Sequence, residues 1–259
     1  MATDNAIAIP AESGCLHGLL RSVPENKRVA LICMGVTRHL ETQPLLQDLA
    51  KALEQVGWSS IRFDYRGRGQ SSHAPDLPTV SSMLQDIAYA LSYIESTFGK
   101  NPDAVIARGF GSRLALECMQ QYPTIPLIMW APIIWLQTSL DIRYRMHEHR
   151  TTGVMKFDDT EMEEVFLKSL KDPTDGEVRS WIVGDRRHLI VQGAEDQVVP
   201  MRLVTEARDL IEKAGSKPEL FLVRGPHPHP DTDELVQPQI VKITEVVGGL
   251  PVSPVGYLS

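Results

Sequence analysis

The chain has 259 residues, of which 42% are hydrophobic and 23% are charged, and its formal net charge is -7 at pH 7. This length and composition fit one large globular domain with a sizeable core, with or without an insertion. The acidic balance argues against a nucleic-acid partner, since nucleic-acid binders present a basic face.

Apolar patterns predict that strands and helices alternate along the chain. Two strands joined by a turn come first, and the later strands are short, nearly continuous apolar runs typical of strands buried on both faces. Strands are expected at 6–10, 15–23, 28–34, 59–65, 103–107, 126–132, 187–193 and 218–225. Helical spacing predicts helices at 44–57, 80–100, 111–123, 201–215 and 232–248, the last of which contains Pro238, a residue that breaks or bends helices.

Strand–helix alternation indicates an α/β fold, with a mostly parallel sheet and helices on both of its faces. The charged segment 133–184 interrupts this rhythm. We predict that it is a small helical cap over the carboxyl edge of the sheet, where open α/β sheets bind ligands. The core domain would then comprise residues 1–132 and 185–259.

Four loops carry a resemblance to a known superfamily. They are "LICMGVTRH" (31–39), "FDYRGRGQSS" (63–72), "QGAEDQVVP" (192–200) and "LVRGPHPHP" (222–230). In this order and spacing, they resemble the α/β-hydrolase superfamily over nearly the whole chain. The resemblance implies that the first loop supplies an oxyanion-hole amide, the third the acidic member of a catalytic triad and the fourth the catalytic histidine.

The segment 104–119, "AVIARGFGSRLALECM", departs from that superfamily. It is similar to the strand–turn–helix elbow that holds the nucleophile within a small–x–nucleophile–x–small motif. Centring this motif on Gly109 puts the small residues Ala107 and Gly111 at the flanks, whereas centring it on Ser112 puts bulky residues there. The nucleophile position is therefore occupied by glycine, which has no side chain to form an acyl-enzyme intermediate.

The resemblance supplies the other members of the site. Asp196 would orient a histidine, and His227 is the predicted partner, with His229 as the alternative. In a third interpretation, this stretch is only a polar, proline-stiffened turn. The oxyanion hole would consist of the backbone N–H groups of Val36 and Phe110, which need no particular side chain.

We predict that Met34, Arg108 and Trp135 contact the substrate. Arg108 would either hold a carboxylate or support a neighbouring loop, and Trp135 would either line a pocket or bury the insertion against the core. We expect no cofactor and no metal, because the three cysteines lack metal-ligand spacing and the pair His147 and His149 lacks a third ligand.

These patterns predict an enzyme that acts on a small carbonyl, ester or thioester compound through a His–Asp general base and a backbone oxyanion hole. Hydrolase, lyase and cofactor-free proton-transfer chemistry all remain open. One alternative is a non-catalytic protein of the same fold that binds a ligand or a partner, and another is a serine esterase or thioesterase inactivated by an engineered Ser→Gly change at 109. The pattern leaves the oligomeric state open. No apolar run reaches the length of a membrane span and no secretory signal pattern is present, so we expect a cytoplasmic protein.

Overall fold

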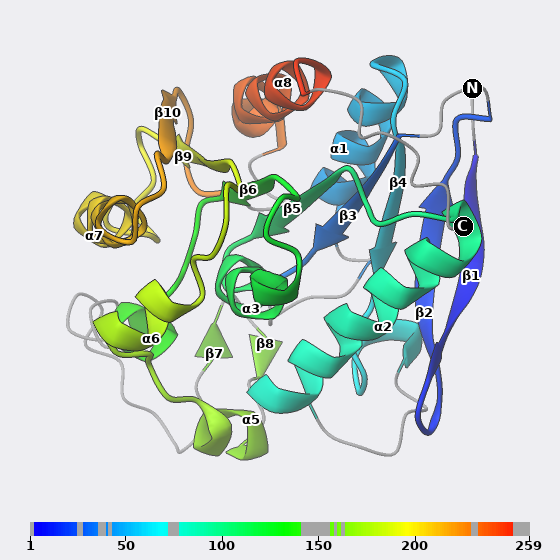
Figure 1. The fold of residues 1–259 in the computed structure, drawn as a ribbon, viewed down its shortest axis with the longest axis horizontal. Coiled ribbons are helices and arrows are strands. Elements are labelled where there is room, and N and C mark those ends of the chain that lie inside the picture. The colour runs from blue at the N-terminus through cyan, green and yellow to red at the C-terminus, as the bar shows by residue number, and fades with distance from the viewer. Residues whose placement is uncertain are drawn as a thin grey trace.

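The computed structural model describes residues 3–24, 28–35, 40, 43–71, 78–140, 156–157, 160–161, 164–228 and 233–250. An eight-stranded sheet runs through the centre of this part of the chain, in the order β1-β2-β4-β3-β5-β6-β9-β10 (Figure 1). Neighbouring strands from β4 to β10 are parallel, whereas β2 is antiparallel to both β1 and β4. The predicted mostly parallel α/β sheet is thus confirmed.

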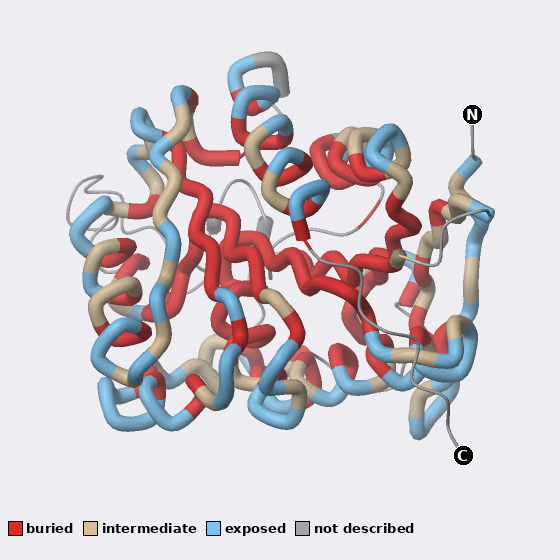
Figure 2. The backbone as a smooth tube through the Cα atoms, turned by 45° about the horizontal axis from the view of Figure 1, so that its top comes forward, coloured by how far each residue is buried: buried red, intermediate tan, exposed pale blue. Residues whose placement is uncertain are grey.

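The strands agree with the apolar runs of the sequence. They are β1 (Asp4–Ala11), β2 (Gly14–Arg21), β3 (Val29–Cys33), β4 (Ser59–Phe63), β5 (Ala104–Arg108), β6 (Leu127–Trp130), β9 (His188–Gly193) and β10 (Glu219–Val223). Every residue of β3, β4, β5, β6 and β9 is buried (Figure 2). Burial on both faces explains why these strands read as continuous apolar runs rather than as alternating patterns.

Helices cover both faces of the sheet. They are α1 (Pro44–Gln55), α2 (Val80–Phe98), α3 (Gly111–Cys118), α7 (Met201–Lys213) and α8 (Asp233–Gly248). On one face α1 packs against α8, and on the other α2 packs against α3 (Figure 1). Apolar residues at helical spacing form the buried side of each amphipathic helix.

One helix differs in detail from the prediction, and one agrees with it. The helix after β5 ends at Cys118, and a short 3₁₀ turn, η3 (Met119–Gln121), follows it before Pro123. The final helix continues through Pro238, as its predicted range implies. Proline removes one intrahelical hydrogen bond, and the buried side chains of Val236 and Ile240 on either side of it hold the helix against the core.

The segment between β6 and β9 contains more than helices. Helices α5 (Glu164–Ser169) and α6 (Asp175–Ser180) lie in it, together with a two-stranded sheet of β7 (Lys156–Phe157) and β8 (Thr160–Glu161) that the sequence pattern did not predict. Strands of two residues are too short to show an alternating pattern. Residues 141–155 of this segment lie outside the described part of the chain.

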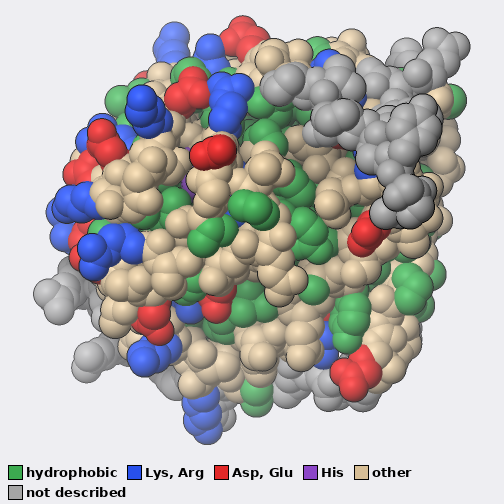
Figure 3. Space-filling model, viewed as in Figure 1, with side chains coloured by type: hydrophobic (Ala, Val, Ile, Leu, Met, Phe, Trp, Pro, Cys, Tyr) green, Lys and Arg blue, Asp and Glu red, His purple; other side chains and the backbone are tan. Residues whose placement is uncertain are grey.

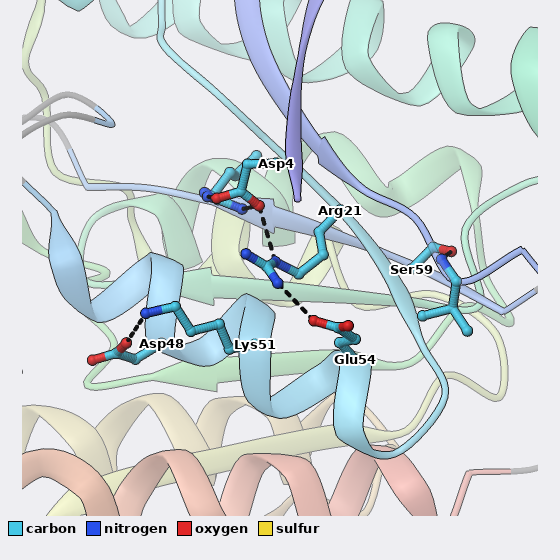
Figure 4. A network of polar contacts seen from close by, with 8 residues as sticks. Asp4, Arg21, Asp48, Lys51, Glu54 and Ser59 are labelled. Carbon is cyan, nitrogen blue, oxygen red and sulfur yellow. Dashed lines mark hydrogen bonds and ion pairs between the residues drawn. The ribbon is translucent and has the colours of Figure 1, made fainter. Parts of the chain in front are cut away.

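A charged network joins the first strand to the sheet (Figure 4). Asp4 accepts hydrogen bonds from Arg21 Nε (2.9 Å) and Arg62 Nη2 (2.5 Å), and Arg21 Nη1 also donates to Glu54 of α1 (2.6 Å). Both arginines are buried. The network therefore connects β1, β2, β4 and α1 at one edge of the molecule.

Candidate active site

A sharp turn between β5 and α3 forms the centre of the candidate site. Its tip is Gly109, whose φ of +57° lies in the left-handed region that favours glycine. The Gly109 amide donates to the Trp130 carbonyl (2.9 Å), and the Gly109 carbonyl accepts from the amides of Ser112 and Ile133 (both 3.0 Å). The tip is therefore fixed by backbone hydrogen bonds to β6 and to the segment that follows it.

The space around this turn explains the pattern of small residues. A Cβ atom on Gly111 would lie 2.3 Å from the Met34 carbonyl oxygen, so no other residue fits there without moving the backbone. Among the described residues beyond its chain neighbours, a Cβ atom on Gly109 would contact Ile133 Cδ1 alone within 4 Å, at 3.9 Å. The described neighbours of the tip thus leave space for a Cβ atom, in contrast to those of Gly111.

Ser112, in the first turn of α3, is hydrogen-bonded to the preceding strand. Its side chain is fully buried, and its Oγ donates to the Ala107 carbonyl at 2.9 Å. This bond ties the first turn of α3 back to β5. Ser112 thus has a structural role, as the bulky residues that flank it in the motif predict.

An aspartate and a histidine meet after the last two strands of the sheet. His227 Nδ1 lies 2.9 Å from Asp196 Oδ2. The second oxygen, Oδ1, accepts from the amides of Val198 and Val199 (both 2.8 Å), and Gln192 Nε2 donates to Oδ2 (2.9 Å). The loops after β9 and β10 therefore bring the predicted pair together.

The environment of Asp196 keeps its carboxylate ionised. Burial raises its pKa, but hydrogen bonds and the charge of His227, together with the two backbone amides, outweigh burial and hold the pKa below its usual value. An ionised carboxylate can only accept hydrogen bonds. It therefore selects the imidazole tautomer that carries the proton on Nδ1, which makes Nε2 the basic nitrogen of His227.

Polar groups from two elements hold the loop around His227 on one side. Gln239 of α8 donates to the Pro226 carbonyl (2.8 Å) and accepts from Trp130 Nε1 (2.7 Å). The Glu195 amide donates to the Gly225 carbonyl (3.1 Å), and the Glu195 carboxylate accepts from the Gly225 amide. The carbonyls that precede His227 are thus bound by groups from α8 and from the loop that carries the aspartate.

Arg108 brings this loop to the elbow. Its Nη1 donates to Gln43 Oε1 (2.9 Å), and its Nη2 donates to the Pro228 carbonyl. Arg108 directly precedes Gly109, and Pro228 directly follows His227, so the contact places the histidine loop beside the tip. Of the two roles that the sequence left open for Arg108, the structure shows the support of a neighbouring loop. A direct contact with substrate stays a prediction.

The predicted oxyanion hole lies partly within the described chain. Phe110 is buried at the start of α3, and no described residue accepts a hydrogen bond from its amide. A Cβ atom on Gly35, after β3, would lie 3.9 Å from this amide nitrogen, so the loop after β3 runs beside it. Val36 and the alternative base His229 lie outside the described residues.

The other predicted substrate contacts are buried. Met34 is fully buried, and its carbonyl accepts from the Tyr65 hydroxyl (3.2 Å). Trp135 is 8% exposed, and its indole Nε1 donates to the Pro173 carbonyl (3.1 Å). Both partners of this bond lie within the segment 133–184, and the Trp135 side chain is part of the hydrophobic core. The predicted binding roles of Met34 and Trp135 stay predictions.

Three buried glutamines support the site but were missed in the sequence. Gln192 contacts Asp196, Gln239 contacts the histidine loop, and Gln43 contacts Arg108. The one available signal was an uncharged polar residue within an apolar pattern, which Gln192 and Gln239 both show. Gln192 lies four residues before Asp196, but the partners of Gln239 and Gln43 are 13 and 65 residues away, so no local pattern identifies those two contacts.

No metal site or membrane helix is found in the described part of the chain. Its histidine, cysteine, aspartate and glutamate side chains form no group of three that could hold a metal ion. His147 and His149 lie outside the described residues. No helix among the described residues is both long and apolar enough to cross a bilayer.

Comparison with known proteins places the chain among hydrolases. A family model described as serine aminopeptidase S33, a hydrolase family, matches residues 24–158. The lysophosphatidylserine lipase ABHD12 of Xenopus tropicalis is 26% identical over 164 residues, which cover 60% of this chain and 39% of that protein. The chain thus spans less than half the length of that relative.

Solved structures share the fold along nearly the whole chain. The esterase Pf2001 of Pyrococcus furiosus has a TM-score of 0.72 at 16% identity, covering 96% of this chain and 90% of its own. Est1E of Butyrivibrio proteoclasticus, bound to ferulic acid, has a TM-score of 0.71 at 16% identity, covering 95% and 99%. A dienelactone hydrolase of Anabaena variabilis has a TM-score of 0.63 at 10% identity, covering 96% of each chain. At these identities the likeness shows the fold.

Proposed function

Since the chain belongs to the serine aminopeptidase S33 family of the α/β-hydrolase superfamily, we propose that it hydrolyses a small ester, thioester or related carbonyl compound without a covalent intermediate. His227 acts as the general base and Asp196 orients it. The observation that carries this proposal is the 2.9 Å contact between His227 and Asp196 in a loop bound to an elbow whose tip is Gly109.

Water takes the place of the serine in this mechanism. Nε2 of His227 removes a proton from water, and the water oxygen forms a bond to the carbonyl carbon of the substrate. The carbonyl electron pair moves to its oxygen, which accepts hydrogen bonds from the Phe110 amide and, as we propose, from the Val36 amide. When the carbonyl re-forms, the bond to the leaving group breaks, and the leaving group takes the proton from His227.

The space above the elbow supports this use of water. A Cβ atom on Gly109 would meet no described atom closer than Ile133 Cδ1 at 3.9 Å beyond its chain neighbours, so the described residues do not crowd the position of the missing side chain. A general base and an oxyanion site each contribute on the order of a hundredfold or more in rate without a covalent step. Ester substrates are favoured because the structural neighbours of this fold are named esterases.

We also propose that residues 133–184 form a cap beside this site. Phe166 of α5 packs edge-to-face on Phe110, with ring centroids 6.1 Å apart. Arg113 of α3 donates to the Lys171 carbonyl at 2.8 Å. These contacts hold the segment against the helix that follows the elbow, so it can shape what reaches Gly109.

Kinetics with a panel of chromogenic esters and acyl thioesters test the proposal. We expect turnover by the unmodified chain, a loss of about a hundredfold or more in kcat for His227→Ala, and a smaller loss for Asp196→Asn. Asp172→Asn, a change at a carboxylate that accepts the Gln137 and Thr138 amides (2.9 and 2.8 Å), is the stability control. Turnover that is equal in the His227 variant would refute the mechanism.

A second function follows from the same glycine. A chain without a nucleophile can bind a carbonyl ligand at the Phe110 amide without converting it, as a receptor would. In that case no ester or thioester is turned over, and His227→Ala leaves the ligand affinity nearly unchanged. Isothermal titration with the esters of the panel and their product acids separates this function from the catalytic one.

A further inference from the structure

We propose that Arg108 and Gln43 form a clamp that positions the His227 loop over the elbow, so that Arg108 is a positioning residue for the general base. This inference rests on the proposed function for its catalytic meaning, but its geometry stands alone. Arg108 is 7% exposed, and its two terminal nitrogens reach separate loops, one through Gln43 Oε1 (2.9 Å) and the other through the Pro228 carbonyl.

The Gln43 side chain binds Arg108 rather than capping its own helix. It occupies the N-cap position of α1, where a side chain usually accepts from a helix amide, yet it makes no such bond. Its backbone is fixed instead, because its amide donates to the Leu40 carbonyl (3.3 Å) and its carbonyl accepts from the Leu46 amide (3.1 Å). The side chain is 1% exposed and points its oxygen at Arg108.

The clamp joins three loops of the site. Gln43 lies at the end of the loop after β3, Arg108 at the base of the elbow, and Pro228 next to His227. The planar, charged guanidinium has donors in a fixed fork, so it sets the distance between its two acceptors more rigidly than a lysine would. On the other side of His227, Gln239 holds the Pro226 carbonyl at 2.8 Å.

A glycine at the tip makes such a clamp necessary. In an elbow with a serine, the hydroxyl also holds the imidazole, because the two side chains hydrogen-bond each other. Gly109 offers no group of this kind. Asp196 fixes the rotation of the His227 ring through Nδ1, but the height of the ring over the tip depends on the loop backbone, which Arg108 and Gln239 hold.

The experiment follows the His227–Asp196 hydrogen bond by proton NMR, using the full chain with ¹⁵N-labelled histidine. We expect a slowly exchanging Nδ1–H signal in the unmodified chain. Arg108→Met should raise its exchange rate with solvent about tenfold or more. Gln43→Leu, which keeps the Arg108 charge, should raise it less, and Arg108→Lys should fall between the unmodified chain and Arg108→Met. Gln43→Leu keeps the test available if Arg108→Met does not fold.

Arg186→Met is the matched control. Arg186 is another buried arginine that donates to backbone carbonyls, those of Met119 and Tyr122, at a distance in sequence from the site. We expect it to lower the melting temperature and leave the Nδ1–H signal unchanged. If Arg108→Met and Gln43→Leu fold and leave the exchange rate unchanged, the clamp does not exist.

Kinetics separate this inference from the proposed function. Where turnover is found, Arg108→Met should lower kcat by about a hundredfold while KM changes about threefold or less, as expected when a base is misplaced but binding is kept. If no variant turns over a substrate and the NMR signal still responds to Arg108→Met, the positioning role stands and the hydrolytic proposal falls. If kcat and the signal both stay unchanged, the positioning role falls alone.

Discussion

In the proposed function, Gly109 decides which chemistry the site can perform. Its φ of +57° lies at the tip of the sharp turn between β5 and α3, and glycine adopts this conformation without the penalty that a Cβ atom brings. The nearby position 111 requires glycine, because a Cβ atom there would lie 2.3 Å from the Met34 carbonyl oxygen. This steric requirement is local, and it is the reason that the sequence alone identifies Gly109 as the tip.

Gly109→Ser should therefore create a reactive nucleophile. Its Cβ atom would contact Ile133 Cδ1 at 3.9 Å, the proposed mechanism places the hydroxyl within reach of His227, and the left-handed backbone costs about 1–2 kcal/mol of stability. We expect a fluorophosphonate probe to add one adduct to this variant in intact-mass spectrometry and none to the unmodified chain. Gly109→Ala carries the same strain without a hydroxyl, so it should lose similar stability and stay unlabelled. A labelled alanine variant would show that the probe reacts elsewhere.

His188 makes the folded chain sensitive to acid. Burial, assisted by the charge of Arg186, lowers its pKa to about 4 from 6.5, and its Nδ1 lies 2.8 Å from Ser216 Oγ. The unfolded chain thus takes up this proton first as the pH falls. The stability present above pH 6.5 is lost progressively towards pH 4, by about 3 kcal/mol in total.

Urea denaturation at a series of pH values measures this loss. His188→Asn keeps a polar partner for Ser216 but does not titrate, so the free energy of unfolding should fall less steeply with acid than in the unmodified chain. Parallel curves for the two proteins between pH 6.5 and pH 4 would contradict the assignment.

The polar contacts between elements are the part of the structure that the sequence pattern does not show. Strand and helix positions could be predicted because buried strands are continuous apolar runs and the helices are amphipathic. The contacts of Gln43 and Gln239 could not be predicted. Gln43 binds Arg108, 65 residues away, and Gln239 binds the Pro226 carbonyl, 13 residues away, through side chains whose directions only the folded sheet defines. The same holds for Asp4, whose partners Arg21 and Arg62 lie in other strands.

Asp4 should stabilise the attachment of β1. Burial raises its pKa, but hydrogen bonds and charge from Arg62 and Arg21 outweigh burial and lower it below 3.8. Its contribution is therefore present above pH 3.8 and is lost as the pH falls below that value. Asp4→Asn removes the carboxylate that Arg21 and Arg62 share. We therefore expect the free energy of unfolding, measured by urea denaturation at neutral pH, to fall by about 1–3 kcal/mol.

Asp48→Asn provides the comparison for this change. Asp48 pairs with Lys51 at 3.0 Å on the exposed side of α1, within the same view (Figure 4). Exposed pairs contribute little, so this variant should lose less than about 0.5 kcal/mol. Equal losses for the two variants would show that the buried network contributes no more than a surface ion pair.

At the scale of the whole molecule, sheet topology assembles the site. The loops after β3, β5, β9 and β10 leave the same edge because these strands are parallel, and the candidate residues of the superfamily resemblance all lie in those loops. This arrangement brings together His227 and Asp196, the pair that the superfamily resemblance implied, although the two are far from the elbow in sequence.

The charge distribution on the surface gives less information about a binding partner than the candidate site does. On the face shown in Figure 3, acidic and basic side chains of the described residues are interspersed, and neither sign forms a continuous patch. Under the proposed function, substrate choice depends on the elbow and on the segment 133–184, and the contact of Phe166 with Phe110 joins the two. The sequence could not predict these contacts, because short strands and irregular loops carry no periodic pattern.

The most direct test of the central claim is intact-mass spectrometry during turnover of a chromogenic ester, with release of the chromophore recorded from the first milliseconds. If water activated by His227 attacks the ester, release is linear without a burst, the protein mass stays unchanged, and the rate is lost in His227→Ala. A burst accompanied by the mass of an acyl group on the protein would contradict this account, as would release at an equal rate by the His227 variant.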